Sequence, residues 1–321
     1  MRIVKTICSA ALPIILLAQG ATAQGARKPA IGGVALAEAG RCHEAVPQLK
    51  KELPLIRNAG LKRSAGLAGV RCAMETGRLD DAVDFIRALT RDFPQDAEVL
   101  YQAVHVYSAL SLKSSQDLLI NASGSYQVRL LNAEALETQE RWSEAAAEYR
   151  AVLAQNPNLQ GIHYRLGRLL LSLPENALTP ATRDEARREF EEELKINPRN
   201  AGAEYVLGEM ARQAGDWAQA AKHFANAARL NPAFADASIG WGRSLISAGK
   251  YEEAIKPLER AVKLQPENPA AHYHLATAYR RAGLKEKAER ESAAFKQASE
   301  RAQRIRHDVR TGIVGPQKAE P

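Results

Sequence analysis

The amino-acid sequence predicts an all-α solenoid, built from helical hairpins that repeat every 34 residues. Five positions carry the period, in the order small residue, alanine, large apolar residue, alanine and proline. A fixed period of this size indicates stacked supersecondary units, each of which completes its core against the next. The recurring residues are Gly208, Ala220, Phe224, Ala227 and Pro232, then Gly242, Ala254, Leu258, Ala261 and Pro266, and finally Ala276 and Ala288.

Each residue type in the period has a physical reason. A glycine such as Gly208 lets the two helices of a hairpin approach closely, while Phe224 fills the space between hairpins. A proline such as Pro232 stops the second helix and sets the step to the next repeat. Glycines in the turns between helices accept the left-handed conformation found at helix ends. These turn glycines are Gly215, Gly249 and Gly283.

The spacing and residue types resemble the tetratricopeptide repeat (TPR). The resemblance implies a right-handed superhelix of antiparallel helix pairs and a general role in protein recognition. Aligned on the alanine and proline positions, the chain holds seven repeats and an eighth that runs into a charged cap, together spanning residues 30–306. The expected repeats are 26–62, 63–96, 97–125, 126–159, 160–200, 201–234, 235–268 and 269–302.

Three parts of the array depart from the regular pattern. The third repeat has a full first helix, Glu98 to Leu110, and a clipped second helix, Ser114 to Ala122. The fifth has seven extra residues within 173–183, and two prolines there predict an enlarged turn. The charged stretch Glu286 to Arg306 predicts the polar helix that covers an exposed end. Residues 24–29 and 307–321 are expected to be disordered.

The first 23 residues have the pattern of an export signal. Arg2 and Lys5 precede the apolar stretch 7–18, and Ala21-Thr22-Ala23 predicts cleavage after Ala23. An uncleaved anchor is the alternative. We expect a periplasmic or secreted protein without membrane insertion after cleavage, because no later stretch reaches about 18 apolar residues. The period together with this signal resembles bacterial periplasmic TPR proteins, whose general role is to organise envelope complexes.

Two cysteines, Cys42 and Cys72, remain after the predicted cleavage. In an oxidising compartment such a pair is a disulfide candidate. By the repeat register, Cys42 opens a second helix and Cys72 lies near the end of the next first helix, toward the same edge of the stack. Two small buried residues that never bond are the alternative.

Charge and motifs exclude several functions. The formal net charge is +7, and +5 without Arg2 and Lys5 (44 − 2 = 42 basic against 37 acidic), which does not indicate nucleic-acid binding. No GxxxxGK[ST], GxSxG or HExxH motif occurs, since Pro47 stands where a second histidine would follow His43-Glu44. The run Glu191-Glu192-Glu193 predicts a solvated helix surface. We expect no enzyme, no metal site and no cofactor.

In TPR proteins the concave groove is lined by positions 2, 5, 9 and 12 of each first helix. Carried over residue by residue, these positions imply an aromatic ladder flanked by cations, suited to a net acidic protein or peptide segment. Tyrosine packed against a neighbouring helix is the alternative. The groove residues implied are Tyr101, Tyr164, Arg168, Tyr205, Arg212, Ile239, Arg243, Tyr273 and Arg280.

The sequence therefore predicts a non-catalytic scaffold of the cell envelope that binds a partner peptide or protein through this groove. Two alternatives stay open: a carrier or chaperone for exported chains, and a subunit of an envelope enzyme complex. Binding of many unrelated peptides would favour the carrier, and polar groups converging in the groove would favour the enzyme complex.

Overall fold

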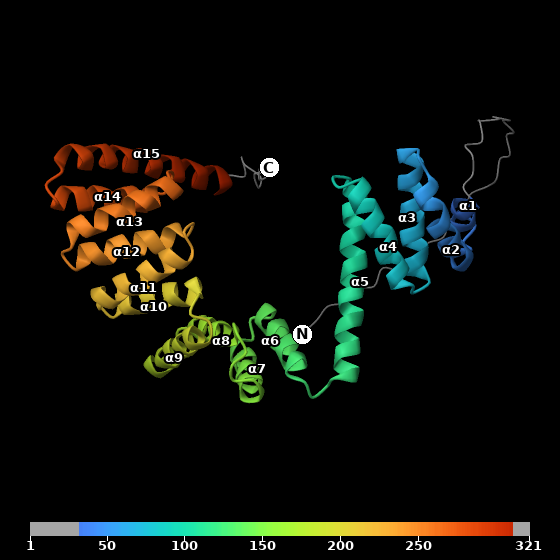
Figure 1. Cartoon of the computed structure of the whole chain (residues 1–321), viewed down its shortest axis with the longest axis horizontal. Helices are drawn as coiled ribbons and strands as arrows, with labels where there is room; N and C mark the ends of the chain where they lie inside the picture. Colours follow the sequence, from blue (N-terminus) through green and yellow to red (C-terminus); the bar gives the residue numbers. More distant parts are fainter. Residues whose placement is uncertain (1–31, 311–321) are drawn as a thin grey trace, which may run out of the picture. The chain divides into compact units, whose positions relative to one another are not determined.

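The structure is a computed structural model that describes residues 32–310, all of whose regular elements are helices (Figure 1). The predicted export signal, the segment 24–29 and residues 311–321 lie outside the described residues. Two compact units divide the chain, with the boundary at Asp117. None of the described helices combines the length and the apolar composition that a bilayer crossing needs.

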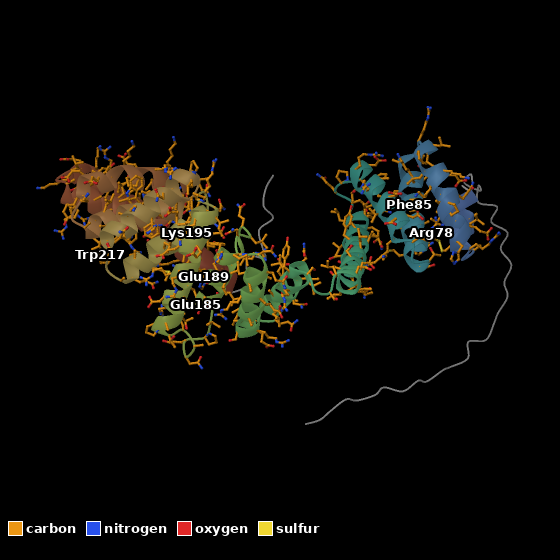
Figure 2. All side chains as sticks on the ribbon, turned by 60° about the horizontal axis from the view of Figure 1, so that its bottom comes forward. Arg78, Phe85, Glu185, Glu189, Lys195 and Trp217 are labelled. Carbon is orange, nitrogen blue, oxygen red and sulfur yellow. A yellow bond between two sulfur atoms is a disulfide. The ribbon has the colours of Figure 1, made fainter. Side chains whose placement is uncertain are left out.

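The N-terminal unit begins with two hairpins. Helix α1 (Gly32–Glu38) pairs with α2 (Cys42–Glu52), which ends in a 3-10 turn, η1 (Leu53–Leu55). Helix α3 (Ala59–Glu75) pairs with α4 (Leu79–Asp92). Helix α5 (Ala97–Asn121), which belongs to this unit as far as Asp117, adds Val99, Ala103 and Val106 to the same hydrophobic core. Figure 2 shows Phe85 within this unit.

The C-terminal unit contains five hairpins in sequence, which confirms the predicted all-helical array of antiparallel pairs. The first helices of neighbouring hairpins also contact one another, α10 with α12 and α12 with α14. The pairs are α6 (Tyr126–Thr138) with α7 (Trp142–Gln155), α8 (Ile162–Leu171) with α9 (Pro180–Ile196), α10 (Ala201–Gln213) with α11 (Trp217–Leu230), α12 (Ala235–Ser247) with α13 (Tyr251–Leu264), and α14 (Pro269–Arg281) with α15 (Lys285–Arg310).

Small residues of the first helices receive large residues of the second helices, as the period predicts. A Cβ atom added to Gly208 would lie 2.9 Å from the Phe224 ring, and one added to Gly167 would lie 2.9 Å from the Phe190 ring. Phe224 and Phe190 are fully buried. These contacts leave no room for a larger side chain, so the glycines set the distance between the two helices of each hairpin.

The turn glycines adopt the predicted left-handed conformation, with φ of 76° at Gly215, 77° at Gly249 and 80° at Gly283. In the hairpin of α6 and α7 the same conformation is taken by Glu140, with φ of 57°. A side chain with Cβ is strained there, because only glycine adopts this region without steric cost.

Two predictions about helix boundaries are wrong. The expected break in the third repeat is absent, and α5 is one helix of 25 residues. Neither glycine nor proline occurs in 97–121, and the Ser115 hydroxyl donates to the Ser111 carbonyl, so nothing interrupts the backbone ladder. Residues 307–310, expected in the tail, continue α15. The enlarged turn does occur: α8 ends at Leu171 and α9 begins at Pro180.

Cys42 on α2 and Cys72 on α3 are joined by a disulfide in the structure, with their Cα atoms 4.8 Å apart (Figure 2). The bond links two neighbouring hairpins, and both cysteines are buried. Glu75 lies beside them, which makes this the one grouping of metal-ligating residue types among residues 32–308. Because the two sulfurs are bonded to each other, neither is a thiolate ligand for a metal.

Candidate binding face

The first helices of the C-terminal unit form a continuous surface, which we call the first-helix face. It is made by α8, α10, α12 and α14. Helices α10, α12 and α14 contact one another in order. Helix α8 joins them through Tyr164, whose hydroxyl lies 2.6 Å from where a Cβ on Gly202 of α10 would be. Residues from successive repeats can therefore act on one ligand here.

Two of the predicted ladder tyrosines use their rings for internal packing. Tyr164 meets Phe190 edge-on at a centroid distance of 5.8 Å. Tyr205 packs between Phe224 and Phe234, at 5.5 Å and 4.8 Å. Burial, with a smaller contribution from nearby carboxylates, raises the pKa of Tyr205. The alternative interpretation of these tyrosines, packing against a neighbouring helix, describes both rings.

The other apolar candidates differ in exposure. Ile239 is 9% exposed and packs with Ala261 and Ala271, so it belongs to the core. Tyr273 on α14 is 53% exposed, and its ring centroid lies 5.7 Å from that of the tilted Phe295 ring. Tyr101 is 59% exposed but lies on α5 of the N-terminal unit. Tyr273 is therefore the open aromatic ring of the first-helix face.

The four predicted arginines also divide into two groups. Arg212 donates two hydrogen bonds to Glu209 one turn earlier, at 2.9 and 2.8 Å. Arg280 donates to the Ser292 hydroxyl at 3.3 Å. Arg168 and Arg243 have no carboxylate within 4 Å among the described residues, and the Arg168 guanidinium lies 5.9 Å from the Tyr164 ring centroid. Three of the four cations are thus available to an anionic ligand.

A half-buried histidine, His274, lies near Arg243. Burial, and to a lesser degree the charge of Arg243, lowers the pKa of His274 to about 4. His274 is therefore neutral at pH 7 and adds no charge to the face. An anionic ligand that approached Arg243 would meet a cation flanked by a neutral ring, with Asp236 as the nearby acid of the same helix.

A cleft of about 480 Å³ opens between α6, α7 and α8. Arg165 bridges it, donating to Glu134 at 2.5 Å and to the Tyr149 hydroxyl at 3.4 Å. Burial, followed by Glu137, raises the pKa of Tyr149 to about 12. The cleft mixes both signs of charge, with Arg168 at its edge. Trp142 and Arg165 also line it and were missed because neither occupies one of the four groove positions.

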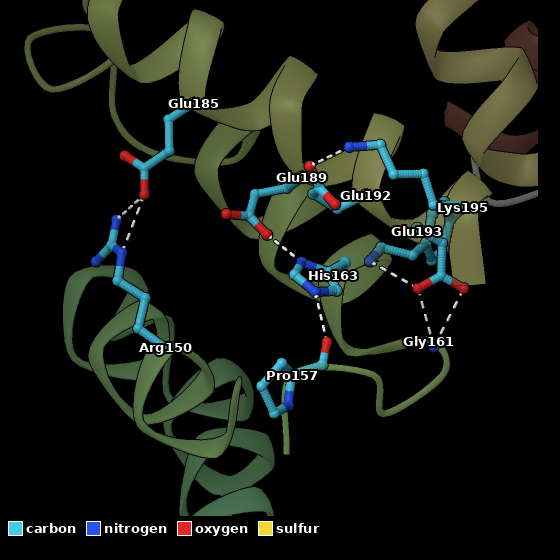
Figure 3. Close-up of polar contacts among 10 residues, drawn as sticks. Arg150, Pro157, Gly161, His163, Glu185, Glu189, Glu192, Glu193 and Lys195 are labelled. Carbon is cyan, nitrogen blue, oxygen red and sulfur yellow. Dashed lines mark hydrogen bonds and ion pairs between the residues drawn. The ribbon is translucent and has the colours of Figure 1, made fainter. Parts of the chain in front are cut away.

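The polar contacts at the start of α8 are satisfied internally (Figure 3). Contrary to the expected solvated surface, Glu193 is fully buried and accepts from the Gly161 N–H at 2.9 Å. The His163 ring lies between a Glu189 carboxylate oxygen, at 2.6 Å, and the Pro157 carbonyl oxygen, at 3.0 Å. Of these contacts, only that of His163 with Pro157 joins two repeats, and the polar groups here bond to one another instead of forming an open site.

The comparisons with known proteins support this fold. Family descriptions match three stretches: "tetratricopeptide repeat" at 130–178 and at 211–260, and "TPR repeat" at 242–283. These stretches of the chain are therefore similar to TPR repeats, a class of repeat that mediates protein–protein interactions. None of these descriptions names a catalytic domain. No curated protein matches the chain.

Several solved structures are similar. YrrB, described as a TPR protein with an unusual peptide-binding site, is 18% identical and has a TM-score of 0.50; the match covers 57% of this chain and 91% of that one. A MamA protein is 19% identical, with a TM-score of 0.49 and coverage of 61% and 98%. MamA from Desulfovibrio magneticus RS-1 is 20% identical, with a TM-score of 0.48 and coverage of 56% and 96%. At this identity the likeness to YrrB shows the fold alone.

Proposed function

We propose that this protein is a non-catalytic scaffold that binds a net acidic protein segment on the first-helix face of its C-terminal unit. One observation carries the proposal: Arg168 and Arg243 face this surface without a carboxylate partner among the described residues, while Tyr273 offers an open ring. A guanidinium without a partner favours a carboxylate ligand. The peptide-binding site described for YrrB supports a peptide as the kind of ligand.

We also propose that the scaffold works in the cell envelope. The export pattern in residues 1–23 supports this location, and so does the Cys42–Cys72 bond, because isolated disulfides persist in oxidising compartments. The scaffold would then organise other envelope proteins, and its specificity would come from the side chains of the first-helix face.

The test is a titration with a labelled peptide in which Glu alternates with Leu, and with its counterpart that has Lys in place of Glu. We expect the acidic peptide to bind and the basic one to fail. Tyr273→Ala should weaken binding by about thirtyfold at any salt concentration, since a buried aromatic anchor contributes about 2 kcal/mol. Tyr205→Ala is less informative, because Tyr205 also packs on Phe224 and Phe234.

A comparison of two arginine variants, Arg243→Ala and Arg212→Ala, makes the test more specific. Arg243→Ala should weaken binding severalfold at low salt and little at high salt, because ion pairs at partly exposed sites are screened. Arg212→Ala should change binding by less than about twofold, since Glu209 already neutralises Arg212. Equal losses from the two variants would indicate non-specific charge attraction and contradict the proposed face. Equal binding of both peptides would favour the carrier function.

A further inference from the structure

Helix α5 presents a stripe of large apolar side chains to solvent. Their exposed fractions are 46% for Leu100, 59% for Tyr101, 64% for Val104, 46% for Tyr107 and 61% for Leu112. Residues three and four apart share one face of a helix, so these five form a continuous surface, which we call the α5 stripe. Monomeric proteins rarely expose such a surface without a function for it.

The α5 stripe carries no charge. At about 100° per residue, the charged side chains of α5 project from other sides of the helix. Ser108 and Ser111, both small and neutral, lie between the large residues on the stripe. Val99, Ala103 and Val106 face away from it, into the core of the N-terminal unit. The charged residues off the stripe are Glu98, Lys113 and Asp117.

The last helix of the C-terminal unit is an example of a polar helix at the solvent-exposed end of a repeat stack. Helix α15 begins Lys285-Glu286-Lys287 and is strongly polar along its length. Such a helix covers the end of a repeat stack and keeps it soluble. Helix α5 presents an uncharged, largely apolar surface instead. The α5 stripe is therefore built for contact, not for solvation.

The stripe is also poorly suited to a second helix of the TPR type. The other first helices offer glycine or alanine to such a partner, as Gly167 does to Phe190 and Gly208 does to Phe224. At the equivalent position of the repeat, α5 has Val104. Close approach of a second helix is blocked there, whereas side-chain packing at an ordinary interhelical distance of about 8–10 Å is not.

We propose that the α5 stripe is the interface with a second copy of this chain. A twofold axis near Val104 would set two α5 helices antiparallel. Leu100 would then meet Ser108 of the second copy, whose small side chain leaves room for it, and Tyr101 would meet Tyr107 of the second copy. A twofold interface must be self-complementary, and an uncharged surface meets its own copy without like-charge repulsion.

The size of the stripe sets the expected strength. In this register Leu112 lies opposite Asp96, before the start of α5 in the second copy, so the contact is made by the other four large side chains and the small residues between them, roughly 450–500 Å² per copy. Two copies would bury about 900–1,000 Å² in total, the range of weak, transient interfaces. We therefore expect a weak dimer with a dissociation constant of about 1–10 µM. This inference does not depend on the proposed peptide-binding function.

Sedimentation velocity of the chain from about 0.5 to 100 µM tests the proposal, and we expect a rise from monomer to dimer over this range. Val104→Glu would place two carboxylates at the axis and should keep the chain monomeric. Leu55→Glu is the matched control, because Leu55 is 79% exposed in the same unit but outside the stripe. It should leave the dimer intact. Circular dichroism checks that both variants are folded.

A charge-swap experiment tests the register. A chain with Tyr101→Lys and Tyr107→Lys should be monomeric, and so should a chain with Tyr101→Glu and Tyr107→Glu. An equimolar mixture of the two should form dimers again, because unlike charges then face each other. A chain that stays monomeric at every concentration overturns the proposal. So does a dimer that Val104→Glu leaves unchanged, or one that Leu55→Glu disrupts equally.

Discussion

The two compact units join their hairpins by different means. In the N-terminal unit, neighbouring hairpins are tied by the Cys42–Cys72 bond and by ion pairs such as Lys50–Asp81 at 2.5 Å. In the C-terminal unit, the Phe224 ring of α11 packs against Gly240 of the next hairpin, 2.8 Å from where a Cβ on that glycine would lie, and His163 bridges the Glu189 carboxylate and the Pro157 carbonyl of the preceding repeat. Ion pairs join neighbouring hairpins in both units, as Arg150–Glu185 does at 2.6 Å in the C-terminal one. The comparison teaches that one repeat pattern tolerates a covalent joint between hairpins as well as joints made by packing and polar contacts alone. The two units should then respond to different perturbations.

Tryptophan fluorescence separates the units, because Trp142, Trp217 and Trp241 all lie in the C-terminal unit and none occurs in residues 1–117. Phe224→Ala should have the largest effect, a loss of about 3–5 kcal/mol, since the ring is fully buried against Gly208. We expect the urea midpoint followed by fluorescence to fall. Phe85→Ala, the matched change in the N-terminal unit, should leave that midpoint in place. A fluorescence shift with Phe85→Ala would show that the units unfold as one.

Reduction of the disulfide should affect the N-terminal unit alone. The sequence separation of 30 residues corresponds to about 3–4 kcal/mol in the chain-entropy model. A reductant should therefore lower the transition followed by circular dichroism and leave the fluorescence transition unchanged. Thiol titration of denatured, unreduced protein from the native compartment should find neither Cys42 nor Cys72 free. Free thiols at both positions would disprove the bond in solution.

Acid should weaken the C-terminal unit before the N-terminal one. His274 has a folded pKa of about 4, below its unfolded value, so between pH 6.5 and 4 the unfolded chain binds the additional proton. The contribution of neutral His274 to the free energy of unfolding is fully present above that window and is lost as the pH drops through it. The loss is about 1–2 kcal/mol after allowing for partial exposure. His274→Gln should flatten this dependence. Arg63 holds the pKa of Asp96 at about 2, so this carboxylate of the N-terminal unit stays ionised.

The smallest effect concerns a turn of the C-terminal unit. Glu140 occupies the left-handed position that glycine takes in the other short turns. Glu140→Gly should raise stability by about 1 kcal/mol, because glycine removes the steric cost of Cβ there. Gly215→Ala at an equivalent turn should have the opposite sign. Thermal melts followed by fluorescence measure both, and a destabilised Glu140→Gly variant would show that no strain is relieved.

The hairpins were predictable because their signal is local and periodic. Residues such as Gly208 and Phe224 lie within one repeat, and together they indicate both helices of the hairpin and the distance between those helices. The unbroken length of helix α5 was not predictable, because Ser114 and Ser115 fit either a turn or a helix. Only the register of the other repeats suggested a break there. The burial of Glu193 was equally hidden, since its partner, the Gly161 N–H, is 32 residues away.

The sequence could predict which positions line the groove, but not whether the side chain at each position is exposed, packed or paired. Arg212 follows Glu209 by three residues, so the rule for neighbours on a helix already indicates this pair. The fate of Tyr205 depends on Phe234, which ends the loop before α12 and turns its ring onto Tyr205. Sequence position gives no ring orientation. Which tyrosine is open, Tyr273 or Tyr205, therefore required coordinates.

The position of the disulfide has a mechanical consequence. Under tension, a stacked array extends by peeling its terminal hairpin, since that hairpin has one neighbour. The bond between Cys42 and Cys72 closes the 30-residue separation between them into a loop. About 100 Å of contour length is thereby withheld from extension at roughly 3.3–3.6 Å per residue. A pull on the N-terminus is carried across two hairpins by the covalent bond, so the load passes directly into α3.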